Sequence, residues 1–148
     1  MRTTNHFDLL HIAVVASDVE VRKSIVSALR AASPLWRVIE TDTSAKALDV
    51  VIRDTPAIMI CDEDLASRPG SDVLAEARAL HPDIVGILLV SAGSSLSIIN
   101  LAGVFRSLKK PVTSHAELIS AICDAESENR RRLEVQAAIF RSLATLAA

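Results

Sequence analysis

The stretch Ala57–Cys61 reads AIMIC, and the acidic residues Asp62, Glu63 and Asp64 follow it directly. Five apolar residues without a polar interruption, with a proline before them and a charged loop after them, are typical of a buried strand. Such continuous apolar strands belong to parallel sheets that are covered by helices on both faces. The segment therefore predicts one strand of an α/β domain, with acidic groups at its carboxyl end.

The same unit recurs along the chain. Further strands are predicted at Ile12–Val15, Trp36–Thr41, Ile84–Val90 and Val104–Leu108. Apolar residues at helical spacing follow each strand. The helices that they predict contain Val21 to Leu29, Ala47 to Ile52 after a cap at Thr43 or Ser44, Val73 to Leu80, Ser94 or Ser95 to Gly103, and the residues after Ser114. Five strand–helix units require a doubly wound parallel sheet with right-handed crossovers and helices on both faces.

The composition is typical of one soluble domain of this kind. Of 148 residues, 50% are hydrophobic but only 3% are aromatic, so small aliphatic side chains make up most of the expected core. The formal net charge of −2 gives no bulk attraction to nucleic acids or membranes. Residues 1–6 lead into no apolar region of the kind found in signal peptides, so we expect none, and no apolar run approaches the ~20 residues of a membrane span. We expect a cytoplasmic protein in which Cys61 and Cys123 are reduced and buried.

Acidic, hydroxyl and lysine residues follow several of the predicted strands. Asp18 comes after the first strand, Asp62 after the third, Ser91 after the fourth and Lys110 after the fifth. Functional groups of doubly wound sheets collect at the carboxyl ends of the strands. An acid, a hydroxyl and a lysine are therefore predicted to meet at one edge of the sheet.

In this order and on these strands, the residues resemble the receiver domain of bacterial response regulators, over about residues 8–125. Asp62 matches the family's phosphorylated aspartate, Ser91 its hydroxyl residue, and Lys110 its lysine before a proline. Gly70 matches the glycine that usually lies eight positions past the aspartate. The resemblance implies a five-stranded, flavodoxin-like sheet with strand order 2-1-3-4-5.

The resemblance also implies a signalling module that is not itself an enzyme. Asp62 would be the nucleophile that accepts a phosphoryl group, and Lys110 and Ser91 would bind phosphoryl oxygens. In the family, phosphorylation draws the hydroxyl inward and shifts the face of the fourth helix. The implied partner is a histidine kinase or a phosphotransfer protein.

The metal-binding half of the site departs from the family pattern. The family places two acids directly after the first strand, where this sequence has Ala16 and Ser17, and Asp18 follows one residue late. Mg²⁺ usually requires one or two carboxylates. We therefore expect weakened Mg²⁺ binding, with Asp62, Asp64 and Asp18 as the remaining ligands. The side chain of Asp18 either reaches the metal or caps the first helix.

Two more expectations concern this edge of the sheet. The side chains of Glu63 and Asp64 are expected to be solvated loop charges. Ser107 occupies the position of the family's aromatic switch on the fifth strand. The relay from the hydroxyl residue to an aromatic ring is therefore expected to be missing.

Residues 126–148 predict a helical extension beyond a receiver domain of residues 1–125. Ser114–Ala148 contains neither Gly nor Pro. Its last part has a wide apolar face formed by Leu133, Val135, Ala137, Ile139, Phe140, Leu143, Ala144 and Leu146. We expect this face to form a homodimer or to connect to a further domain; the alternative is a helix that folds back onto its own domain. Residues 138–146 are similar to the helix that leads into HD-GYP cyclic-dinucleotide phosphodiesterase domains.

Two functional hypotheses follow. In the first, the chain is a receiver that accepts phosphate on Asp62 and signals through its C-terminal helix. In the second, which rests on Ala16, Ser17 and Ser107, it is a phosphorylation-independent pseudo-receiver. Such a module would dimerise or bind a partner, and would regulate a cyclic-dinucleotide phosphodiesterase or another output domain. A small flavodoxin-like enzyme is not supported, because the sequence has no Gly-rich phosphate loop and no nucleophile elbow.

Overall fold

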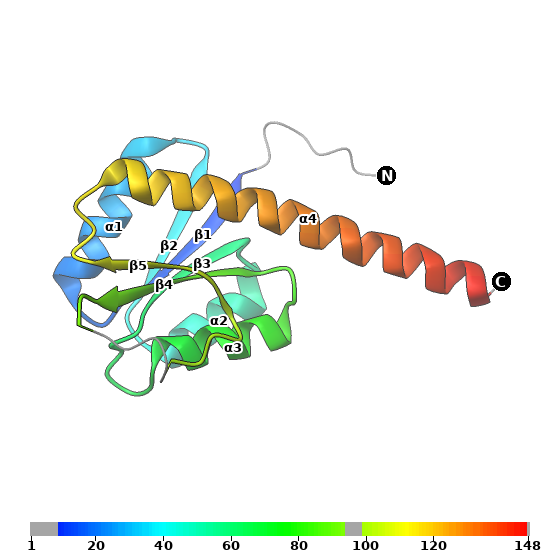
Figure 1. Ribbon diagram of the computed structural model, residues 1–148, viewed down its shortest axis with the longest axis horizontal. Coiled ribbons are helices and arrows are strands. Elements are labelled where there is room, and N and C mark those ends of the chain that lie inside the picture. The colour runs from blue at the N-terminus through cyan, green and yellow to red at the C-terminus, as the bar shows by residue number, and fades with distance from the viewer. Residues whose placement is uncertain (1–8, 94–98, 148) are drawn as a thin grey trace.

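The computed structural model describes residues 9–93 and 99–147, and its centre is a five-stranded parallel sheet (Figure 1). The strands are β1 (Leu10–Val15), β2 (Trp36–Thr41), β3 (Ile58–Asp62), β4 (Val85–Ser91) and β5 (Val104–Lys110). They pair in the order β2-β1-β3-β4-β5. The α/β fold and the strand order are thereby confirmed.

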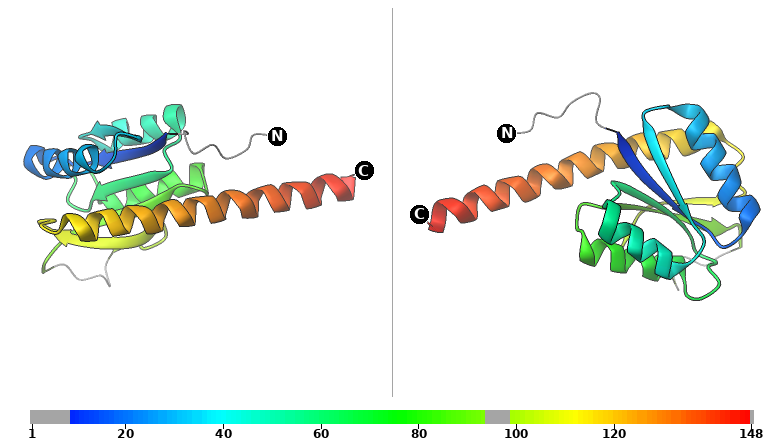
Figure 2. Two further views of the ribbon diagram at one scale, coloured as in Figure 1. Left: turned by 90° about the horizontal axis from the view of Figure 1, so that it is seen from above. Right: turned by 180° about the vertical axis from the view of Figure 1, so that it is seen from behind.

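Helices of the described chain cover both faces of the sheet (Figure 2). One face carries α1 (Val19–Ala32) and α4 (His115–Ala147), and the other carries α2 (Ser44–Asp54) and α3 (Gly70–Leu80). Side chains alternate along each strand, so that those of β1 contribute in turn to the core under α1 and α4 and to the core under α2 and α3. Because both faces are buried, the strands can be apolar throughout, as the sequence indicated.

The helix starts follow from local capping groups. Oδ1 of Asp18 accepts two backbone N–H groups in the first turn of α1, at 2.8 and 3.2 Å. The hydroxyl of Thr43 accepts an N–H of α2 at 3.2 Å, and that of Ser114 accepts the N–H of Glu117 in α4 at 3.1 Å. Each of these bonds satisfies a donor that the helix itself leaves free. Asp18 therefore has the capping role, and Thr43 caps the second helix.

The prediction of a helix that ends at Gly103 is wrong for residues 99–103, which form a loop and a turn before β5. The rest of that predicted helix, residues 94–98, lies outside the described part of the chain. Gly103 meets a different requirement. A Cβ at this position would overlap with the backbone of Leu74 in α3. Arg78 of the same helix also donates a hydrogen bond to a carbonyl of the segment, at 2.6 Å. The glycine permits close packing here and does not end a helix.

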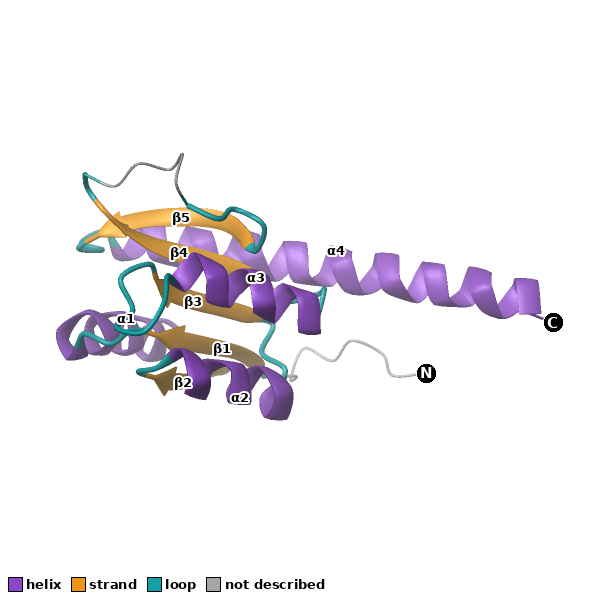
Figure 3. Ribbon diagram, turned by 90° about the horizontal axis from the view of Figure 1, so that it is seen from below, coloured by secondary structure: helices purple, strands orange, loops and turns teal. Residues whose placement is uncertain are grey.

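The last helix, α4, is 33 residues long and holds to the domain through its first half. Leu118 is buried against the sheet. Farther along, the side-chain amide of Asn129 donates to the carbonyl of Asp83 at 2.9 Å, and the guanidinium of Arg132 donates to that of Ile84 at 2.7 Å. The helix then projects away from the domain (Figure 3). These bonds fix its direction at the point where it leaves.

The projecting part leaves its apolar face uncovered. The exposed fraction is 74% at Phe140 and 82% at Leu146, and Leu133, Val135, Ile139 and Leu143 are exposed as well. The helix therefore does not fold back onto its own domain. Within residues 9–93 and 99–147, α4 included, no helix has both the length and the apolar character needed to cross a bilayer.

Candidate functional site

Asp62, Ser91 and Lys110 are the last residues of β3, β4 and β5, which are adjacent strands. Ser91 and Lys110 are direct partners in the register of β4 and β5. Because the strands are parallel, their carboxyl ends open on the same edge of the sheet. The structure thus brings the three predicted residues together.

Asp62 is buried and paired. Only 1% of its surface is exposed, and Nζ of Lys110 lies 2.7 Å from its Oδ1. The same oxygen accepts the backbone N–H of Asp64 at 3.0 Å. A carboxylate at such a depth requires these partners, since an unpaired buried charge is costly.

The side chain of Asp64 is exposed in the loop after β3, as expected of a solvated charge, but it also joins the same group. Its Oδ2 lies 3.0 Å from Nζ of Lys110 and accepts the Ser91 hydroxyl at 3.0 Å. The hydrogen bond from Lys110, followed by that from Ser91, holds the pKa of Asp64 below its usual value. We call Asp62, Asp64, Ser91 and Lys110 the polar cluster. The hydroxyl of Ser91 therefore donates to Asp64 and not to Asp62, the predicted phosphate acceptor.

Lys110 connects the two carboxylates. Burial alone would lower the pKa of Lys110, but the hydrogen bonds to Asp62 and then to Asp64 outweigh it, and the pKa lies above its usual value. Its side chain is only 17% exposed. The ammonium is thus a fixed charge between two acids and stays protonated at neutral pH.

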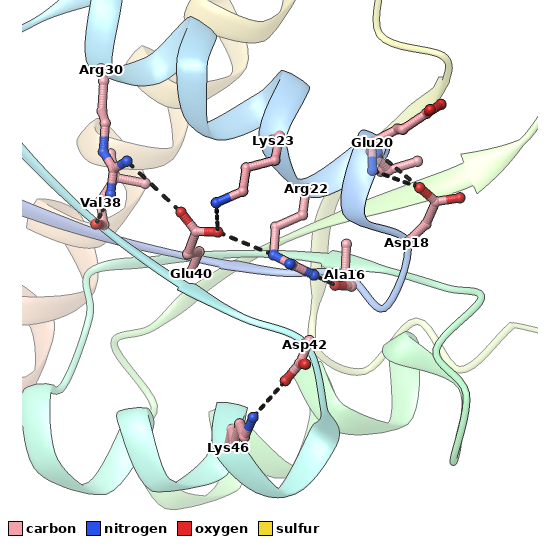
Figure 4. A network of polar contacts seen from close by, with 11 residues as sticks. Ala16, Asp18, Glu20, Arg22, Lys23, Arg30, Val38, Glu40, Asp42 and Lys46 are labelled. Carbon is pink, nitrogen blue, oxygen red and sulfur yellow. Dashed lines mark hydrogen bonds and ion pairs between the residues drawn. The ribbon is translucent and has the colours of Figure 1, made fainter.

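The loop between β1 and α1 presents no free acid to the polar cluster. Ala16 is buried, and its carbonyl accepts a hydrogen bond from Arg22 at 2.8 Å (Figure 4). The hydroxyl of Ser17 donates to the carbonyl of Asp42 and accepts the N–H of Ala66, both at 3.1 Å. Ala16 and Ser17 therefore contact neighbouring segments through their carbonyl and hydroxyl groups.

Two residues that follow Asp62 fix the path of the loop. The side chain of Glu63 accepts the N–H of Ser71 at 2.8 Å, and its carbonyl accepts the N–H of Gly70 at 3.0 Å. Glu63 therefore caps α3. The sequence did not indicate this role, because Glu63 lies eight residues before Ser71, whereas capping patterns span three or four residues. Gly70 packs so closely that a Cβ there would overlap with the carbonyl of Asp62.

Solved structures of receiver domains share this architecture. A signal receiver domain of an HD domain-containing protein from Pseudomonas fluorescens Pf-5 matches with a TM-score of 0.79 and 20% identity, covering 90% of this chain and 98% of that one. A response regulator receiver domain protein from Clostridium thermocellum matches with 0.73 and 26%, covering 84% and 98%. The chain has the receiver-domain fold. A CheY-like receiver domain protein from Methanospirillum hungatei JF-1 matches with 0.74 and 23%, covering 83% and 98%. No protein-family model matches the sequence, and no curated protein does.

The donor set of this receiver fold does not fit the magnesium ion that the family implies. Over the described ranges, no group of three or more Asp, Glu, His or Cys side chains could hold a metal ion. The predicted ligands are engaged elsewhere: Asp18 caps α1, while Asp62 and Asp64 share the ammonium of Lys110. Mg²⁺ requires a near-octahedral set of oxygen ligands, usually with carboxylates among them. These residues therefore do not support chemistry that depends on this ion.

A cavity lies next to the polar cluster. Its volume is about 690 Å³, and it lies beside the ends of β4 and β5. Its lining includes the small residues Ser91, Ala92 and Ser107. Ser107, at the family's aromatic position, thus borders a cavity next to the polar cluster.

The cysteines differ in environment. Cys61 is buried in β3, and burial, with a smaller contribution from Asp62, raises the pKa of its thiol. Cys123 is also a free thiol but is exposed. The expectation that both are buried is therefore wrong for Cys123, which lies on the exposed side of α4. Its apolar neighbours in the sequence, Ile122 among them, lie on the buried side of the helix.

Proposed function

We propose that the chain is a cytoplasmic signalling receiver that accepts a phosphoryl group on Asp62. The observation that carries this proposal is the buried Asp62 carboxylate with Lys110 bound to it at 2.7 Å and Ser91 at the end of the next strand. Oδ1 of Asp62 holds Lys110 and the N–H of Asp64. Its other oxygen has no hydrogen bond to any residue in the described parts of the chain, and is the attacking atom in this proposal.

The transfer step is a substitution at phosphorus. An Asp62 oxygen forms a bond to the phosphorus of a phosphohistidine on a histidine kinase or phosphotransfer protein, and the P–N bond breaks. The imidazole takes up a proton as it leaves. Charge on the equatorial phosphoryl oxygens is then stabilised by the Lys110 ammonium and the Ser91 hydroxyl.

The projecting half of α4 supports a second part of the proposal, in which the helix transmits the signal as a homodimer contact or as a link to an output domain. The similar domain from Pseudomonas fluorescens belongs to an HD domain-containing protein. This agrees with the similarity of residues 138–146 to the helix that precedes a cyclic-dinucleotide phosphodiesterase domain. An output of that kind is the one we favour.

Intact-protein mass spectrometry after incubation with acetyl phosphate and Mg²⁺ tests the acceptor. The expected result is a mass gain of one phosphoryl group in the natural protein and none in Asp62→Asn. No gain, under conditions that label an ordinary receiver, would reject phosphate acceptance.

The alternative, a pseudo-receiver that works without phosphorylation, is favoured by the loop between β1 and α1, where Ala16 and Ser17 carry no carboxylate and Asp18 caps α1. Its signature is dimerisation or partner binding that Asp62→Asn leaves unchanged. Truncation after Arg132 should abolish this dimerisation or binding. The cut is placed there because Asn129 and Arg132 still bind the domain.

A further inference from the structure

The carboxylate of Asp64 binds two hydrogen-bond donors at a single oxygen. Its Oδ2 accepts the Ser91 hydroxyl and the Lys110 ammonium, each at 3.0 Å. These donors come from the ends of β4 and β5, whereas Asp64 lies in the loop after β3. Asp64 therefore connects three segments of the site.

Backbone hydrogen bonds of the loop after β3 fix Asp64 next to Asp62. Its own N–H donates to Oδ1 of Asp62 at 3.0 Å. The preceding residue, Glu63, is fixed by bonds to Ser71 and Gly70 at the start of α3. The position of Asp64 is thus set by the loop, although 61% of its side chain is exposed.

A phosphoryl group on Asp62 would need the same donors. It would carry negative oxygens just beyond the carboxylate, and such oxygens bind best to ammonium and hydroxyl groups with charge-assisted hydrogen bonds. Lys110 already contacts Asp62, and Ser91 follows on the neighbouring strand. Both donors are bound to a negative oxygen before any phosphate arrives.

We propose that the Asp64 carboxylate is a built-in substitute for the phosphoryl group, which keeps Ser91 and Lys110 in the arrangement that phosphorylation of Asp62 would otherwise produce. The inference rests on the proposed phosphate acceptance at Asp62. It has two consequences. An incoming phosphoryl group must displace Asp64 from both donors, which slows labelling, and a phosphoryl group that has arrived moves Ser91 little.

The first consequence is tested by the labelling rate of Asp62 with acetyl phosphate. Asp64→Ala should be labelled faster than the natural protein, on the order of tenfold, because competition and repulsion by the carboxylate are removed. The exposed side chain makes this change compatible with folding. The control is Asp49→Ala, which removes the same charge from an exposed position on α2 where the carboxylate pairs with Arg53. The control should be labelled at the natural rate.

The second consequence is tested by ¹H–¹⁵N NMR spectra with beryllofluoride as the phosphoryl analogue. In the natural protein the amide signals of Ser91 and Lys110 should shift little. In Asp64→Ala they should start from new positions and return toward the natural ones when the analogue is added.

The outcomes separate the two proposals. Equal labelling rates in the natural protein and Asp64→Ala, or equally large shifts in both, would overturn the role of Asp64 and leave phosphate acceptance intact. Labelling of neither protein would reject both.

Discussion

At the scale of the residue, the site depends on how closely groups approach Asp62. Its carboxylate is neutralised by Lys110, and its carbonyl is covered by Gly70 at the start of α3. Removing one partner of a buried ion pair costs more than the pair contributes, because the other charge is left without compensation. Side chains that touch nothing of the proposed phosphate can therefore still decide whether Asp62 is correctly placed.

Gly70→Ala should destabilise the domain by about 3 kcal/mol, because the added methyl group would overlap with the carbonyl of Asp62 and press on Cys61. Urea unfolding followed by circular dichroism measures the change. The matched control is Gly93→Ala, where the methyl group would meet no atom of the described residues within 4 Å, so the change should stay below about 1 kcal/mol. Equal unfolding midpoints for the two variants would mean that the loop gives way at Gly70.

The residues of the site were predictable only in part. The meeting of Asp62, Ser91 and Lys110 follows from strand order, because neighbouring parallel strands end at one edge. The bond between Asp64 and Ser91 does not, because it depends on the path of the loop after β3. That path is set by the distant cap of Glu63 on α3, which no short-range pattern indicates.

At the scale of the element, hydrophobic periodicity predicted all five strands and the four helices found in the described residues, since each has an apolar face matched to its period. It failed for residues 99–103, where Ile99 is buried but the chain forms a loop against α3. It could also not indicate how far α4 holds to the domain. That is set by Asn129 and Arg132, polar residues in a stretch that reads as solvated.

The attachment of α4 should depend on pH through Glu128. Hydrogen bonds from Arg131 and Arg132 lower the pKa of Glu128 to about 2, against 4.5 for the free group. A depressed pKa stabilises the folded state above pH 4.5, and this contribution is lost as the pH falls from 4.5 toward 2. After solvent screening it is roughly 1 kcal/mol.

Urea unfolding at pH 7 and pH 3 measures this contribution. Glu128→Gln should be less stable than the natural protein at pH 7, and roughly half of this difference should remain at pH 3, because pH 3 lies between the folded pKa of about 2 and the ordinary value of 4.5. Glu126→Gln, which removes an exposed acid paired with Arg130, is the matched control and should show little change at either pH. A constant difference between Glu128→Gln and the natural protein at both pH values would contradict the role of ionisation.

At the scale of the whole molecule, β4 connects the polar cluster with the projecting helix. Ser91 ends the strand at the cluster, while Asp83 and Ile84, just before its other end, accept the bonds from Asn129 and Arg132 of α4. A shift of β4 would therefore act on both places. This gives the polar cluster a physical route along β4 to the projecting helix.

The apolar face beyond Arg132 should form a homodimer, because contiguous exposed apolar surface of this extent marks an interaction site. Ile139→Glu with Leu143→Glu, one turn apart on that face, should convert the dimer to a monomer, since each chain buries these side chains against its partner and each contributes about 2 kcal/mol. Ala138→Glu, on the polar side of the helix, is the matched control and should remain dimeric. Sedimentation equilibrium measures the association, and circular dichroism checks that α4 stays helical. A natural protein that is monomeric at the highest accessible concentration would rule out self-association and favour the link to an output domain.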